Sequence, residues 1–150
     1  MNVFRRPALE PVKRLLSAAG LPTDDLTSAH LEHFFARGGE QELTGTVGLE
    51  IAGDVALLRS LAVAADRRGQ GYGQELVSAA ERHARAHGVK EIYLLTTTAQ
   101  RFFEHLGYRA SARATAPAAI SATREFASIC PASAVFMVKK LAPGGAAEAG

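Results

Sequence analysis

Apolar and polar residues alternate along one central stretch of the chain and give way to a more apolar run. From Leu43 to Ile51 the alternation has a period of two, which predicts a half-buried strand. Gly53 and Asp54 then turn the chain, and Val55 to Val63 returns as a more central strand. Four residues of this second strand lie two positions apart and should share one face: Leu57, Arg59, Leu61 and Val63.

Other stretches carry apolar residues at the three- and four-residue spacing of helices. The predicted helices are Ala8 to Ala19, Asp24 or Asp25 to about Arg37, Gln74 to His87, and Ala99 to Leu106. Further strands are predicted at Asn2 to Arg6, Glu91 to Leu95, Tyr108 to Arg113, and Ala134 to Leu141.

The stretch from Val55 to Leu95 reads strand, loop, helix, strand, so its two strands should be parallel. The pattern as a whole predicts an α/β fold with a mixed sheet. We expect residues 1–141 to form one domain and residues 142–150, which are small and carry no pattern, to form a flexible tail.

Composition narrows the class of protein. The 150 residues are 47% hydrophobic and 21% charged, which is typical of a globular domain with a real core. A formal charge of +2 argues against a nucleic-acid partner, and no apolar run is long enough to span a membrane. We therefore expect a cytoplasmic protein with no membrane partner. Metal is not expected, because His30 and His33 lie on one predicted helix, which supplies too few ligands, and His83 and His105 read as surface residues.

Arg68 to Gly73 reads Arg-Gly-Gln-Gly-Tyr-Gly, between a predicted strand and a predicted helix. A loop with alternating glycines can aim several N–H groups into one cavity at a helix N-terminus, where an anion is favoured. The dinucleotide-binding pattern fails because Gln74 stands at its third glycine, and no Gly-Lys-Ser/Thr ending is present. A phosphate-bearing ligand is the first hypothesis, and a turn without a ligand is the alternative.

The arrangement Arg-x-x-Gly-x-Gly after a strand ending in Val63 resembles the coenzyme A loop of the GNAT superfamily of N-acetyltransferases. The segment from Thr96 to Tyr108 is similar to the helix that follows the fifth strand in this family. The resemblance covers Val55 to Tyr108 and implies a mostly antiparallel sheet of six to seven strands, with a splayed parallel pair and helices on both faces.

The resemblance also implies acetyl-CoA as co-substrate and a set of residues that hold it. Backbone groups of Leu61 and Val63 would bind the pantetheine arm, and the Val63 N–H would polarise the thioester carbonyl. The pyrophosphate would meet the loop, and Phe103 completes the predicted cofactor-binding set: Leu61, Val63, Arg68, Gly69, Gln70, Gly71, Tyr72, Gly73, Gln74 and Phe103.

The proton-transfer residues depart from the family pattern. No carboxylate lies early in the strand that ends at Val63, and Phe103, where many members place a tyrosine, has no proton to give. Glu50 or Glu125 remains as a distant base acting through water, and Tyr108 as an acid. Alternatively, the amine arrives neutral and solvent assists the leaving thiolate.

The acceptor is predicted to contact Arg59, Arg124, Thr96 and Thr97. Arg59 either clamps an anionic group of the substrate or forms an ion pair, with Glu50 as the candidate partner. Arg124 is either a second clamp or part of a solvated helix face. Cys130, a lone thiol before Pro131, reads as a core or turn residue, and contact with a trivalent arsenical is the alternative.

Three short segments resemble a bacterial GNAT subgroup associated with arsenic-resistance operons: Leu94 to Ala99, Thr123 to Phe126, and Cys130 to Ala134. This resemblance implies acetylation of a small-molecule amine, such as an amino acid or an arsenic- or phosphorus-containing analogue. Two alternatives stay open: acetylation of a protein N-terminus or lysine, and non-catalytic binding of acetyl-CoA. The resemblance also implies a homodimer.

Overall fold

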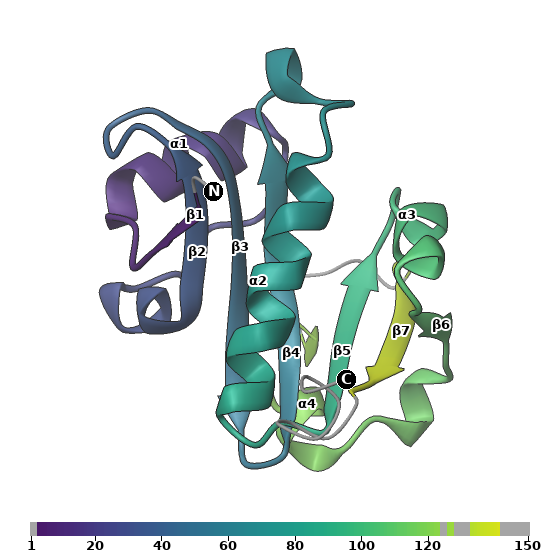
Figure 1. The fold of residues 1–150 in the computed structure, drawn as a ribbon. Helices are drawn as coiled ribbons and strands as arrows, with labels where there is room; N and C mark the ends of the chain where they lie inside the picture. The colour runs from purple at the N-terminus through teal and green to yellow at the C-terminus, as the bar shows by residue number, and fades with distance from the viewer. Residues whose placement is uncertain (1–2, 124–125, 128–132, 142–150) are drawn as a thin grey trace. The chain divides into compact units, whose positions relative to one another are not determined.

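The computed structural model describes residues 3–123, 126–127 and 133–141 (Figure 1). The chain divides into two compact units. The first comprises Met1–Glu50 and Leu58–His83, and the second comprises Ile51–Leu57 and Ala84–Gly150. Within the described ranges, no helix has the length and apolar character needed to cross a membrane.

Seven strands form one mixed sheet in the order β1-β2-β3-β4-β5-β7-β6. Their bounds are β1 Val3–Arg5, β2 Phe34–Gly38, β3 Leu43–Ala52, β4 Val55–Val63, β5 Glu91–Thr96, β6 Arg109–Ala110 and β7 Val135–Lys140. Strands β4 and β5 pair in parallel. The pairs β1–β2, β2–β3, β5–β7 and β6–β7 are antiparallel. The predicted mixed, mostly antiparallel α/β fold is confirmed.

The first unit is built on strands β1, β2 and β3 and on helix α1 (Leu9–Ala18). Phe34 of β2 lies opposite Gly48 of β3, and a Cβ atom at Gly48 would lie 2.1 Å from the Phe34 ring. The aromatic ring therefore occupies the space that a side chain would fill. The buried core cluster of this unit consists of Val12, Leu16, Leu26, Leu31, Phe34, Ala36, Leu43 and Ala62.

The helix predicted from Asp24 or Asp25 to about Arg37 is wrong. The structure has a 3₁₀ helix, η1, at Ser28–His33, followed directly by β2. Phe34, Phe35 and Ala36 are consecutive and all buried, so this strand is covered on both faces and lacks the alternation that marks a half-buried strand. Pairing with β1 and β3 overrides the helical spacing of the apolar residues.

Helix α2 (Tyr72–Ala86) begins two positions before the predicted start at Gln74. It presents the buried residues Leu76, Val77 and Ala80 at helical spacing. This helix carries the glycine loop at its N-terminal end.

The second unit contains the parallel ladder, in which Val55 to Leu57 pair with Glu91 to Tyr93. Helices α3 (Gln100–His105) and α4 (Ala118–Ser121) and the 3₁₀ helix η3 (Arg113–Thr115) also belong to it. Its buried core cluster consists of Leu57, Tyr93, Ile120, Phe136 and Val138. The strand predicted from Tyr108 to Arg113 is shorter than expected, because only Arg109–Ala110 pair with β7 before the chain enters η3.

Candidate functional site

The glycine loop connects the end of β4 to the start of α2. After Val63 the chain forms a short 3₁₀ helix, η2 (Ala65–Arg67), and then passes through Arg68 to Gly71. The Arg68 Nε atom donates a hydrogen bond to the Val63 carbonyl oxygen at 3.1 Å. This bond ties the first residue of the loop to the end of the strand.

Two glycines of the loop have backbone angles that other residues rarely adopt. Gly69 has φ +81° and Gly71 has φ +82°, and a Cβ atom built on either would meet nothing within 4 Å. Conformation therefore requires glycine here, while the space beside both residues is open. Such a loop can admit a ligand close to its backbone.

Helix α2 offers N–H groups next to this open space. The Glu75 N–H bonds the Gly71 carbonyl at 3.1 Å, so Gly71 accepts the first hydrogen bond of the helix. The N–H groups of Tyr72, Gly73 and Gln74 precede it and have no carbonyl of the helix to bond. Together with the helix dipole, they favour an anion at this end.

The Arg37 side chain of β2 contacts the first turn of α2. The Arg37 guanidinium carbon lies 3.6 Å from the centre of the Tyr72 ring, and Arg37 Nε lies 2.7 Å from Glu75 Oε1. Beside this contact is a hollow of about 800 Å³ lined by Arg37, Gly38, Leu43, Thr44, Arg67 and Tyr72, among others. The first turn of α2 is thus in contact with Arg37, and an open hollow lies next to it.

Strand β4, which leads to the loop, runs through one residue of unusual backbone conformation, Ser60, which has φ +58°. A non-glycine residue in this region is strained and breaks the two-residue alternation of a strand. Leu57 and Arg59, which precede Ser60 on this strand, are buried. Beyond Ser60, Leu61 and Val63 are half-buried, so their backbone lies near the surface of the unit.

Arg59 is at the centre of a buried ion-pair cluster. Its side chain is 0% exposed, and its guanidinium makes a bidentate contact with Asp25, in which Nη2 lies 2.8 Å from Oδ1. Nη1 also donates to Glu50 Oε2 at 2.7 Å, and Nε donates to Ser60 Oγ at 3.0 Å. Of the two interpretations of Arg59, the ion pair with Glu50 is present.

Asp25 is the member of this cluster that sequence reasoning missed. Its side chain is 3% exposed, and the hydrogen bond from Arg59 holds the pKa of its carboxyl below the ordinary value of 3.8, against the opposing effect of burial. The sequence offered Asp25 only as a helix cap, because its partner is 34 residues away. Glu50 remains 23% exposed, so its carboxylate is the part of the cluster that solvent reaches.

A model of the acetyltransferase (GNAT) family matches residues 3–108, which is more than half of the chain. The chain belongs to the GNAT acetyltransferase family. The match includes the glycine loop and the whole segment up to Tyr108. None of the curated proteins matches the sequence.

Solved structures share the GNAT fold at low sequence identity. N-acetylglutamate synthase from Neisseria gonorrhoeae, solved with coenzyme A and N-acetyl-glutamate, is 18% identical with a TM-score of 0.77, over 95% of this chain and 36% of that one. The chain thus spans about a third of the synthase. A GNAT acetyltransferase from Staphylococcus aureus is 20% identical with a TM-score of 0.74, over 94% and 99% of the two chains. PaiA N-acetyltransferase from Thermoplasma acidophilum, solved with coenzyme A, is 16% identical with a TM-score of 0.65, over 94% and 100%.

Four predicted GNAT site residues lie in the second unit. Phe103 and Tyr108 are buried, with ring centres 5.5 Å apart in an edge-on contact, and the Tyr108 N–H bonds the Phe103 carbonyl. Thr96 Oγ1 accepts the N–H of Ala99 at 3.0 Å, just before α3, while Thr97 is exposed. Tyr108 therefore packs in the interior, and Thr96 supports the start of a helix.

The remaining predicted site residues lie outside the described part of the chain. These are Arg124, Glu125 and Cys130, together with the predicted tail at 142–150.

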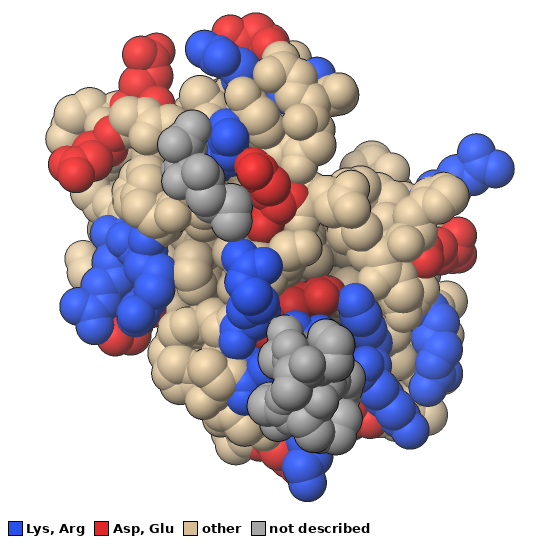
Figure 2. All heavy atoms as spheres, in the orientation of Figure 1, with Lys and Arg blue, Asp and Glu red and all other residues tan. Residues whose placement is uncertain are grey.

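The charged side chains show no single dominant sign on the face drawn in Figure 2. Acidic and basic groups are interspersed there, as expected for a formal charge of +2.

Proposed function

We propose that this protein transfers the acetyl group of acetyl-CoA to the amine of a small molecule, such as an amino acid or an amino-acid analogue. The observation that carries the proposal is the loop from Arg68 to Gly71, which is open beside Gly69 and Gly71 and leads into the N-terminus of α2. The pyrophosphate of coenzyme A is an anion of the kind that such a helix end favours. Three N–H donors in the first turn of the helix suit its oxygens.

The acyl group would lie beside the end of β4. Backbone groups of Leu61 and Val63 would pair with the pantetheine arm as an added strand does, and both residues are half-buried rather than enclosed. The Val63 N–H would donate to the oxygen that becomes negative when the amine attacks the thioester carbon. Because the Val63 carbonyl already binds Arg68 Nε, this peptide segment is held on one side before the ligand arrives.

Glu50 is the proposed base, acting through water. Its Oε2 atom is held by Arg59, which is itself fixed by Asp25, so the carboxylate is positioned by a buried arginine. In this proposal Arg59 is a positioning residue, because its guanidinium is fully buried and occupied by these partners. Tyr108 remains the candidate acid, with release of the thiolate into solvent as the alternative.

The choice of a small acceptor draws on two likenesses. The synthase from N. gonorrhoeae was solved in complex with coenzyme A and with N-acetyl-glutamate, which is an acetylated amino acid. The resemblance of Leu94 to Ala99 to the arsenic-resistance subgroup adds arsenic- and phosphorus-containing amino-acid analogues to the acceptors worth testing. A cytoplasmic location and a homodimer complete the proposal.

The experiment measures thiol release from acetyl-CoA against a panel of amino acids, their arsenic and phosphorus analogues, and peptides. Turnover with at least one small amine is expected. Turnover with peptides alone would contradict the proposal and indicate a protein acetyltransferase. Tight binding of coenzyme A without any turnover would indicate a protein that binds the cofactor but does not catalyse the reaction.

The loop assignment is tested by Gly71→Ala, with Gly53→Ala as the matched control. Both glycines have positive φ (+82° and +65°) with open space beside them, so the backbone strain of the two substitutions is similar. Gly53 lies in the hairpin turn between β3 and β4. We expect Gly71→Ala to weaken coenzyme A binding at least tenfold by calorimetry and Gly53→Ala to leave it unchanged. Equal affinities in the two variants would remove the loop from the cofactor site.

A further inference from the structure

Arg37 of β2 contacts two side chains in the first turn of α2, where the pyrophosphate of coenzyme A is proposed to bind. Its guanidinium carbon lies 3.6 Å from the centre of the Tyr72 ring, and its Nε atom lies 2.7 Å from Glu75 Oε1. The Arg37 side chain is only 12% exposed, which is unusually low for an arginine. The sequence gives no sign of this contact, because β2 and α2 are far apart in the chain.

The contact between Arg37 and Glu75 is an ion pair from which water is largely excluded. Arg37 Nε and Glu75 Oε1 are both buried atoms. Neither has a hydrogen-bond partner among the described residues, so their 2.7 Å contact is ionic without the geometry of a hydrogen bond. Because water does not reach these two atoms, their attraction is screened less than that of an exposed pair.

Glu75 is the acidic residue in the first turn of α2. A carboxylate at this position stabilises the helix through its dipole, but it draws on the same positive potential that a bound anion needs. The free N–H groups of Tyr72, Gly73 and Gln74 lie in the same turn. A Glu75 carboxylate without a partner would therefore repel a pyrophosphate bound to them.

We propose that Arg37 is a positioning residue of the acetyl-CoA site, which neutralises Glu75 and so keeps the first turn of α2 receptive to the pyrophosphate. This inference rests on the proposed function. The Tyr72 ring fixes the planar guanidinium by stacking and cation–π attraction, so the positive charge stays beside Glu75. Arg37 acts through Glu75 and Tyr72 and need not touch the cofactor itself.

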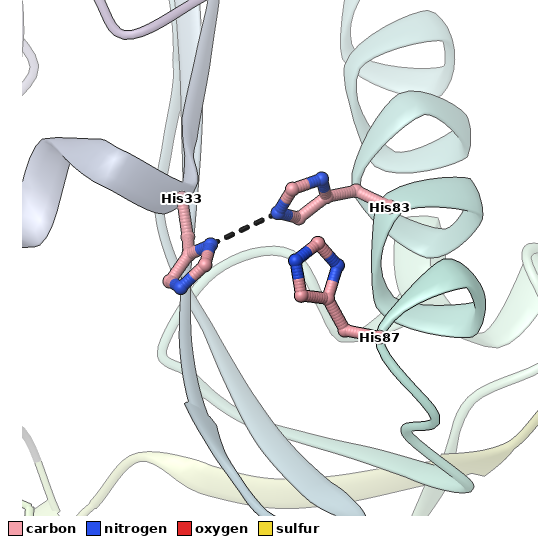
Figure 3. A group of neighbouring side chains, drawn as sticks. All are labelled: His33, His83 and His87. Atoms are coloured by element: carbon pink, nitrogen blue, oxygen red, sulfur yellow. Dashed lines mark hydrogen bonds between the residues drawn. The ribbon is translucent and has the colours of Figure 1, made fainter.

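A second contact holds α2 near its C-terminal end, far from the glycine loop. His33 Nδ1 and His83 Nε2 are 2.9 Å apart in a hydrogen bond (Figure 3), and the Phe35 ring packs edge-on against His83 at a centre-to-centre distance of 5.2 Å. The interpretation of His83 as a simple surface residue is corrected, because its ring is half-buried. His83 lies about 16 Å along the helix from Tyr72, so it anchors α2 at a distance from the proposed anion site.

The test measures the dissociation constant of coenzyme A by titration calorimetry. Arg37→Gln should weaken binding about tenfold at low salt, and Arg37→Lys, which keeps the positive charge, should weaken it less. Arg6→Gln is the matched control for charge, because it removes an arginine from an exposed ion pair with Glu32 in the same unit. His83→Gln is the control for anchoring of the helix. Both controls should bind coenzyme A as the wild type does.

A double variant identifies the mechanism. Once Glu75→Gln has removed the carboxylate, Arg37 has no charge to neutralise, so Arg37→Gln with Glu75→Gln should bind coenzyme A within about twofold of the wild type. Raising the NaCl concentration to about 0.5 M should reduce the difference between Arg37→Gln and the wild type, because salt screens a charge effect. A purely structural role would lower the melting temperature of Arg37→Gln and show neither the rescue nor the salt dependence.

Steady-state kinetics separate this inference from the proposed function. With an amine that the wild type acetylates, Arg37→Gln should raise the KM for acetyl-CoA about tenfold and leave kcat and the KM for the amine nearly unchanged. Wild-type protein that binds coenzyme A but acetylates no amine would contradict the proposed function alone, since the binding series still tests Arg37. Circular dichroism establishes that each variant is folded. Wild-type affinity in Arg37→Gln, or weakened affinity that Glu75→Gln does not restore, would overturn the inference about Arg37, and wild-type protein that binds no coenzyme A would overturn both.

Discussion

The glycine loop and the Arg59 cluster are two polar regions of the same unit, built in opposite ways. The loop is exposed, and its proposed ligand groups are backbone N–H atoms whose direction is set by the φ angles of Gly69 and Gly71. The cluster is buried, and it consists of side chains from three separate parts of the chain: Asp25, Glu50 and Arg59.

Each region contains one arginine whose contacts illustrate the difference between a local site and a buried cluster. Arg68 is exposed and makes a hydrogen bond to a carbonyl five residues back, so the whole contact lies within one local segment. Arg59 is enclosed and binds an aspartate 34 residues back. A local backbone site can be lost with the fold kept, whereas a buried charge cluster belongs to the fold itself.

The largest expected effect is on stability, from Arg59→Ala. Removing the guanidinium leaves the Asp25 carboxylate buried without its partner, which should lower the free energy of unfolding by about 3–5 kcal/mol. Urea denaturation measures this change. Arg68→Ala is the matched comparison, because it removes an exposed arginine and should alter stability by less than about 0.5 kcal/mol while weakening coenzyme A binding.

A double variant tests whether the loss of stability comes from leaving a buried charge without a partner. Arg59→Met with Asp25→Leu replaces the pair by apolar side chains of similar size and should recover much of the lost stability. If Arg59→Ala and Arg68→Ala cost the same stability, the contrast between the two regions would be wrong.

The pH dependence of stability should follow the cluster. The folded-state pKa of Asp25 is lowered by Arg59, so the folded protein binds fewer protons at this site than the unfolded chain does. Its contribution to stability is therefore present above the ordinary value of 3.8 and is lost as the pH falls through the folded-state pKa. The free energy of unfolding, measured by urea denaturation between pH 3 and 6, should depend less steeply on pH in Asp25→Asn than in the wild type. The same pH dependence in both proteins would mean that Asp25 does not cause the loss of stability at low pH.

The same contrast explains how much could be predicted from the sequence. The loop was identified because glycine spacing between a strand and a helix is local information, and the family match covers it. Only one partner of Arg59 could be predicted. Glu50 lies nine residues before it on the neighbouring strand, whereas Asp25 lies 34 residues before it, and no sequence pattern relates the two. The strand β2 was missed for a similar reason, since Phe34 becomes a strand residue by packing over Gly48 of a later strand.

The smallest expected effect lies at Ser60, the residue that joins the cluster to the end of β4. Its φ of +58° is strained for any residue with a Cβ atom, by about 1–2 kcal/mol. Ser60→Ala and Ser60→Gly both remove the hydroxyl that accepts the Arg59 Nε–H, but only glycine also relieves the strain. We expect the glycine variant to be more stable than the alanine variant by about 1 kcal/mol in urea denaturation.

Ala62 provides the reference for this comparison, because it lies on the same strand without a positive φ. Replacing Ala62 by glycine should destabilise the protein, as glycine usually does inside a strand. The order of alanine and glycine should therefore be opposite at positions 60 and 62. If alanine were the more stable residue at both positions, the positive φ at position 60 would carry no measurable strain.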